Sequence, residues 1–146
     1  MREFTLATTI DAYPEDVWDV LADFERYPEW HPLVERITVN THWSTQLKVV
    51  VRISRRITLR GSLLEFDPPR RMQWDGRHAL WGLLQPRYTL EITSDSGVAV
   101  VTQNLKIGGL LRRLAPGLFS SLPDALAESA HAIKHQVERR PERRAA

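Results

Sequence analysis

The sequence predicts an α+β domain in which a seven-stranded antiparallel sheet packs against one long C-terminal helix. Between about residues 33 and 107, apolar and polar residues alternate, as they do in strands with one covered and one wet face. Residues 2–10 alternate in the same way and add a first strand to the six expected in this region. Beyond about residue 118 the apolar period becomes that of an amphipathic helix.

The segment after the first strand is predicted to be helical. Pro14 suits the first position of a helix, and Glu15 suits the positive end of the helix dipole. Apolar residues then follow at helical spacing as far as Phe24. A short second helical turn is expected from Phe24 to Tyr27, and Pro28 and Pro32 are expected to end it.

The alternating region divides into strands at two turn signals. One is Asp67-Pro68-Pro69 and the other is the run from Ser94 to Gly97, and their spacing is that of a meander. The parity of the strands between these turns places Trp74, Tyr88 and Gln103 on the covered face.

The final third of the chain carries one apolar stripe on a helix expected from Leu118 to Val137. The members recur at i, i+3, i+4 and i+7 and are Phe119, Leu122, Leu126, Ala130, Ile133 and Val137. Because Pro116, Gly117 and Pro123 interrupt the region, a separate short segment is expected over 109–114.

Length and charge favour a single domain over residues 1–138 with a basic, unpacked tail at 139–146. The last nine residues hold four Arg and two Glu, which equals the net charge of +2 for the whole chain, so residues 1–137 are neutral. A neutral body lacks the cations that a phosphate backbone requires, and no nucleic-acid partner is expected. A basic face balanced by acidic residues elsewhere stays open.

The chain has no cysteine, which excludes disulfides, thiolate catalysis and Cys-ligated zinc. The N-terminus has strand character without a charged stretch and apolar block, so we expect no signal peptide and a cytoplasmic location. No apolar stretch approaches the ~20 residues of a membrane span. We also expect no cofactor and no metal.

Three segments resemble the START and polyketide-cyclase (SRPBCC) superfamily. TTIDAYPEDVWDVLADFERYPEWHPLVERI, from Thr8 to Ile37, is similar to its N-terminal signature. LLEFDPPRRMQWDG, from Leu63 to Gly76, is similar to its mid-sheet hairpin. TQNLKIGGLL, from Thr102 to Leu111, resembles its last strand running into the closing helix. The resemblance implies a helix-grip fold with a ligand cavity between the sheet and the C-terminal helix.

The sequence departs from the family pattern at positions that are often polar. Pro86 stands where many relatives have His, and Leu105 stands where an acidic residue is common. The loop from Asn40 to Gln46 has no Gly where relatives commonly have two. These changes favour an apolar ligand and weaken an enzymatic role carried over from relatives.

The candidate ligand-binding residues are large aromatics, one amide and the helix stripe, because such groups give contact area with few directed hydrogen bonds. They are Trp30, Trp74, Trp81, Tyr88, Gln103, Phe119, Leu122 and Leu126. Simple core packing is the alternative for each aromatic. Gln103 needs a buried partner in either case.

The candidates for acid–base catalysis are His78 and Tyr88, since imidazole titrates near neutrality and His78 follows a strand end. A surface loop is the alternative for His78. A loop position is expected for His31, with a place at the mouth of the cavity as the alternative. His131 and His135 have the i, i+4 spacing of metal ligands but lie off the apolar stripe, so a solvated surface is the better interpretation. The covered-face residues that parity assigns include no acid and no histidine.

The leading hypothesis is therefore a carrier or sensor that binds a small, largely apolar molecule of lipid, aromatic or polyketide type. The alternative is a cyclase or dehydratase of the polyketide type, which would need a proton-transfer group inside the cavity. A third hypothesis is a protein-interaction module, which would show an exposed apolar patch.

Overall fold

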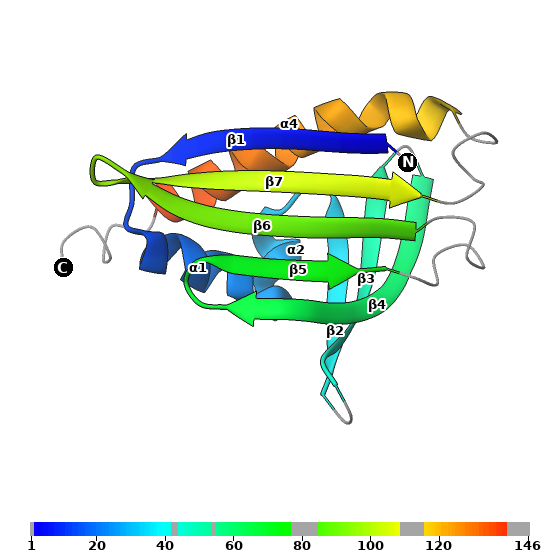
Figure 1. The fold of residues 1–146 in the computed structure, drawn as a ribbon. Coiled ribbons are helices and arrows are strands. Elements are labelled where there is room, and N and C mark those ends of the chain that lie inside the picture. Colours follow the sequence, from blue (N-terminus) through cyan, green and yellow to red (C-terminus); the bar gives the residue numbers. More distant parts are fainter. Residues whose placement is uncertain (1, 42–43, 54, 77–84, 109–115, 140–146) are drawn as a thin grey trace.

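The computed structural model describes residues 2–41, 44–53, 55–76, 85–108 and 116–139, and within them it contains one seven-stranded antiparallel sheet (Figure 1). The strands are β1 (Arg2–Ile10), β2 (Val34–Asn40), β3 (Gln46–Ile53), β4 (Arg55–Asp67), β5 (Arg71–Asp75), β6 (Gln85–Asp95) and β7 (Val98–Gly108). Their order is β1-β7-β6-β5-β4-β3-β2, so only β1 pairs with a strand distant in sequence.

Within the described residues, four helical elements lie on one side of this sheet (Figure 1). They are α1 (Pro14–Ala22), the 3₁₀ turn η1 (Phe24–Arg26), the single turn α2 (Tyr27–Trp30) and the long helix α4 (Pro116–Glu138). Helix α4 contacts β1 and α1 along its length. This is the predicted helix-grip arrangement, with the short helices after the first strand and the long helix covering the sheet.

Two prolines behave differently from the prediction. Pro28 lies in the first turn of α2, where its missing N–H has no helical partner to lose, so a turn continues through Trp30 instead of ending. Pro123 lies inside α4 and does not interrupt it. The ring is exposed, so the carbonyl that loses its N–H donor in the helix faces solvent, where water donates the hydrogen bond instead. The short segment expected over 109–114 lies outside the described residues.

Strand β4 bends and thereby turns a flat meander into a curved wall (Figure 1). Its first part pairs with β3 and its last part with β5, and a bulge between Leu63 and Glu65 shifts the register. At the bend, Gly61 lies against the backbone of β5. A Cβ atom at this position would lie 1.6 Å from the carbonyl oxygen of Asp75, so only glycine permits this approach.

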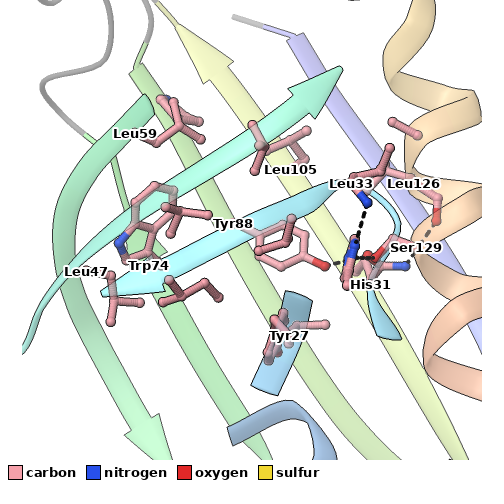
Figure 2. A pocket seen from close by; sticks show the side chains of 18 of the residues that line it. Tyr27, His31, Leu33, Leu47, Leu59, Trp74, Tyr88, Leu105, Leu126 and Ser129 are labelled. Carbon is pink, nitrogen blue, oxygen red and sulfur yellow. Dashed lines mark hydrogen bonds between the residues drawn. The ribbon is translucent and has the colours of Figure 1, made fainter. Parts of the chain in front are cut away.

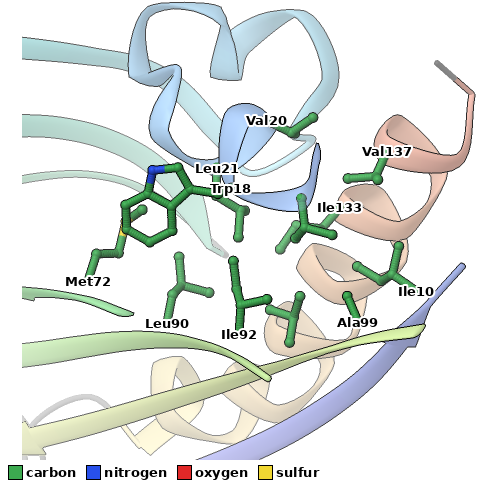
Figure 3. Close-up of a cluster of buried hydrophobic side chains, with 12 residues drawn as sticks. Ile10, Trp18, Val20, Leu21, Met72, Leu90, Ile92, Ala99, Ile133 and Val137 are labelled. Atoms are coloured by element: carbon green, nitrogen blue, oxygen red, sulfur yellow. The ribbon is translucent and has the colours of Figure 1, made fainter. Parts of the chain in front are cut away.

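The covered face has the predicted parity. Trp74 pairs with Tyr88, and Leu90 pairs with Gln103, so these side chains project towards α4. One end of this face is a closed apolar core in which α1 and the C-terminal half of α4 pack on β6 and β7 (Figure 3). Its members include Ile10, Trp18, Val20, Leu21, Met72, Leu90, Ile92, Ala99, Ile133 and Val137.

The close approach at Gly61 generates the first prediction. Gly61→Ala is expected to lower the free energy of unfolding by at least about 3 kcal/mol, because the strands must separate to admit the methyl group. Urea unfolding followed by circular dichroism measures this. Gly108→Ala is the matched control, since a Cβ there meets nothing within 4 Å, and a change of equal size in both variants would contradict the explanation.

Candidate ligand-binding cavity

A cavity of about 200 Å³ lies between the sheet and α4. It lies where three apolar clusters meet: the closed core of Figure 3, a cluster of Ile57, Ile107 and Leu122, and a cluster of Leu47, Val49 and Trp74. Helix α4 contributes Ile133 and Val137 to the first cluster and Leu122 to the second. The cavity wall is almost entirely apolar.

The structure places most of the predicted site residues on this wall. Trp74, Tyr88, Gln103, Leu122 and Leu126 all line the cavity. Whether they contact a ligand stays a prediction. Trp81 and His78 lie outside the described residues, and so does the side chain of Phe119.

Trp30 does not line the cavity, although the sequence analysis named it as a candidate. In the single turn of α2, Tyr27 faces the cavity, and Trp30 occupies a separate hollow beside His131 and His135 of α4. The ring of Trp30 packs at 4.8 Å from that of Tyr27 and at 5.3 Å from that of His31, measured between centroids. Its place is thus behind the residues that form the wall.

The polar groups of the cavity gather at one side and bond to one another (Figure 2). Tyr88 on β6 donates its hydroxyl to the Oε1 atom of Gln103 on β7. The Nε2 atom of Gln103 donates to the carbonyl of Leu126 on α4 at 3.3 Å. Ser129 on α4 also lies close enough to Tyr88 to affect its pKa. These bonds join two strands of the sheet to the helix across the cavity.

His31, in the connection between α2 and β2, continues this chain of hydrogen bonds. Its Nδ1 atom accepts the backbone N–H of Leu33 at 3.2 Å, which places the proton of the neutral ring on Nε2. Nε2 then donates to the Ser129 hydroxyl at 2.9 Å, and the Ser129 side chain lies close enough to Tyr88 to act on its pKa. These groups form a series from the backbone of Leu33 to that of Leu126. We call this series the polar chain.

Burial changes the acid–base character of the polar chain. It lowers the pKa of His31 from 6.5 to about 4, so the ring is neutral at pH 7. Burial also raises the pKa of Tyr88 well above its usual range, although the Ser129 side chain opposes this. The pKa of Tyr27 is likewise raised by burial, and then by the nearby Tyr88 and Asp23. Neither tyrosine is a base near neutral pH.

Parity did not find three of the polar cavity residues. Parity assigned no histidine to the covered side, but His31 lines the cavity. It lies in the connection between α2 and β2, which has no strand or helix period from which its direction could be predicted. Tyr27 lies on a single turn, which is also too short for a periodic signal; its hydroxyl donates to the carbonyl of Leu21 at 2.5 Å. Ser129 had a usable signal, since it falls three residues after Leu126 on the apolar stripe and is buried.

Two further features bear on what the cavity can bind. The indole N–H of Trp74 is buried and has no acceptor within the described part of the chain, and Figure 2 shows it on the side of the ring away from Tyr88. Within the same ranges, no three His, Asp or Glu side chains come together as metal ligands. His131 and His135 are exposed and stack on each other at 6.4 Å between ring centroids.

The buried, neutral His31 makes stability depend on pH. Its folded pKa of about 4 lies below the unfolded value of 6.5, so the unfolded chain binds a proton that the folded chain refuses. Stability is complete above about pH 6.5 and is expected to fall by about 3 kcal/mol as the pH drops towards 4. Urea unfolding from pH 7 to pH 4 measures this loss. The loss should shrink in His31→Gln and persist in His135→Gln; an unchanged profile in both variants would show that His31 is not responsible.

The sequence matches the family described as "Polyketide cyclase / dehydrase and lipid transport" over residues 1–138. A search of curated proteins found no match. Within the described residues, no helix is long and apolar enough to cross a membrane.

Solved structures with the same fold are numerous. A START superfamily protein from Mycobacterium smegmatis aligns with a TM-score of 0.80 at 15% identity, over 93% of this chain and 97% of that one. The Zhui aromatase/cyclase from Streptomyces sp. R1128 aligns with a TM-score of 0.75 at 16% identity, over 96% and 95%. Major latex-like protein 151 from Panax ginseng aligns with a TM-score of 0.72 at 11% identity, over 92% and 96%. At these identities the likeness shows the fold, and the family match over residues 1–138 establishes that the chain belongs to the polyketide cyclase/dehydrase and lipid transport family.

Proposed function

We propose that this protein binds a small, largely apolar molecule in the cavity beneath α4 and acts as its carrier or sensor. The observation that carries the proposal is a cavity whose wall is apolar and whose polar groups bond to one another. Burial of apolar ligand surface against such a wall is favourable, and a polar ligand finds few hydrogen-bonding groups that are not already engaged. Burying about 300 Å² of apolar ligand surface contributes roughly 7 kcal/mol before entropy costs.

The volume of the cavity limits the size of the ligand. A cavity of roughly 150 Å³ accommodates benzene, and pockets for drug-sized ligands measure roughly 300–1,000 Å³. A volume of about 200 Å³ therefore suits a ligand of one or two rings, or a short branched chain. The buried indole N–H of Trp74 favours a ligand with one oxygen at that side, since an unpaired buried donor costs free energy.

A second candidate function, a cyclase or dehydratase, is favoured by one observation. His31 and Tyr88 lie on the cavity wall and are joined through Ser129, so groups that exchange protons are present where a substrate would bind. Two features oppose catalysis. Both ring nitrogens of His31 already have partners, and burial holds the tyrosine in its protonated form. A reaction would have to break the polar chain first.

Filling the cavity tests the binding proposal. Ala125 is buried on the cavity wall, and Ala125→Phe places a ring in the space that a ligand would occupy. We expect at least a tenfold loss of affinity for a fluorescent apolar probe of two rings, such as 1-naphthylamine, with little loss of stability. Fluorescence titration gives the affinity, and urea unfolding gives the stability.

The matched control for this test is Ala127→Phe. Ala127 is exposed on α4, two residues further along the same helix, so its ring stays in solvent. Probe binding should be unchanged in this variant. Equal binding by the Ala125→Phe variant and the wild-type protein would contradict the cavity as the binding site.

Tyr88→Phe separates the carrier from the enzyme. The variant keeps the aromatic ring on the wall but removes the hydroxyl that Gln103 accepts, which costs about 1–3 kcal/mol of stability. As a carrier, the protein should retain probe affinity within about threefold, because the hydroxyl bonds to protein and not to ligand. Turnover of a polyketide-like substrate by the wild-type protein that is lost in this variant, with binding intact, would favour the enzyme.

A further inference from the structure

The outer face of strands β2, β3 and β4 carries an excess of positive charge, although the domain as a whole is neutral. Five exposed cationic side chains share it, namely Arg36, Lys48, Arg52, Arg56 and Arg60. Their strands are adjacent, and their positions alternate with those of the covered face. Among the described side chains of β2, β3 and residues 56–61 of β4, one carboxylate, Glu35, stands against these five cations, which gives a local net charge of +4. We call this surface the basic face.

The pairing of the strands places like charges directly opposite each other. Lys48 pairs with Arg60, and Arg52 pairs with Arg56, at the close cross-strand positions where like charges destabilise a sheet. Glu35 relieves the second pair, because its carboxylate contacts Arg52 at 3.1 Å and Arg56 at 2.7 Å. These contacts also hold the pKa of Glu35 below its usual range, with the hydrogen bond from Arg56 as the largest cause.

The remaining cations of the basic face have no counterion within the described residues. No hydrogen bond or ion pair joins Arg36, Lys48 or Arg60 to another described side chain. The same outer face is balanced farther along the sheet. There Arg71 contacts Glu65 at 2.8 Å and Glu91 at 3.3 Å, and Arg87 lies 3.8 Å from Asp75. The charge excess is thus local to three strands.

We propose that the basic face docks the protein on an anionic lipid bilayer. A bilayer surface supplies many negative headgroups across a broad area, which matches cations spread over three strands. A protein partner would be expected to find apolar or aromatic anchors, but the large apolar residues that are exposed in the described part of the chain, Tyr13, Leu64 and Phe66, lie outside the cationic positions. Single-stranded nucleic acid would be expected to find aromatic stacking platforms, and none of the described residues beside these cations is aromatic.

Docking of this kind is reversible and sensitive to salt, because it rests on exposed charges without an apolar anchor. It goes beyond cavity binding and does not need an occupied cavity. A bilayer is also the place where a carrier of apolar molecules would load or release its cargo. The outcome of the membrane test is therefore independent of the outcome of the cavity test.

The experiment is flotation of the full chain with vesicles of phosphatidylcholine alone or mixed with phosphatidylserine, at low and at high salt. We expect binding to the anionic vesicles at low salt, loss of that binding at high salt, and no binding to phosphatidylcholine alone. The double variant Lys48→Gln/Arg60→Gln should bind the anionic vesicles at least tenfold more weakly. The matched control Arg71→Gln/Arg87→Gln removes the same charge from the balanced part of the sheet and should bind almost as well as the wild-type protein.

All variants keep the Arg-rich tail, so any contribution from the tail is common to them. Circular dichroism and urea unfolding confirm that each variant is folded before flotation. Absence of binding to anionic vesicles would overturn the proposal, as would equal weakening in the two double variants. Binding to a nucleic acid or to an acidic protein without binding to vesicles would also overturn it.

Discussion

The polar chain is the constraint on which the cavity depends. It begins at the backbone N–H of Leu33, passes through four side chains and ends at the carbonyl of Leu126, so that a connection, two strands and the long helix share one set of hydrogen bonds. Each member is largely buried, and a buried polar group that loses its partner costs about 1–3 kcal/mol. The helix therefore holds one position relative to the sheet, because a shift along its axis would leave several of these groups unpaired at once.

The same chain explains why the cavity favours apolar contents. In a site with free buried donors or acceptors, a ligand that satisfies them gains over one that does not. Here Gln103, Tyr88, Ser129 and His31 are already engaged with one another, so a polar ligand on that side must break a bond to make one. The buried N–H of Trp74 lies on the other side of the wall and has no acceptor among the described residues. Selection by this cavity therefore rests on shape and apolar area, with at most one directed contact.

The sequence could predict the fold and the sheet wall because both follow a period. Parity placed Trp74, Tyr88 and Gln103 on the covered face, and the stripe placed Leu122 and Leu126 on the helix. The strand and helix periods predict no side-chain direction for residues in turns or beyond a bulge. His31 and Tyr27 lie in the short turns between α1 and β2, and the bulge in β4 shifts the register of its last residues. Pairing across that bulge puts Phe66 opposite Met72 on the covered face, where it packs edge-on against Trp18 at 5.1 Å.

The residues of α4 explain why a cavity stays open between this helix and the sheet. The large stripe residues Leu122, Leu126 and Ile133 all line the cavity, and beside them the helix presents two small residues, Ala125 and Ser129. These two are four residues apart, so they lie one above the other on the same helix face. Ser129 cannot fill the space with apolar volume, because its hydroxyl is held between His31 and Tyr88. Rigid wall residues on the sheet side, with the indole of Trp74 lying over Gly76, cannot collapse into the gap either. The cavity is thus a product of small residues on the helix facing large aromatics on the sheet, with hydrogen bonds fixing the distance between them.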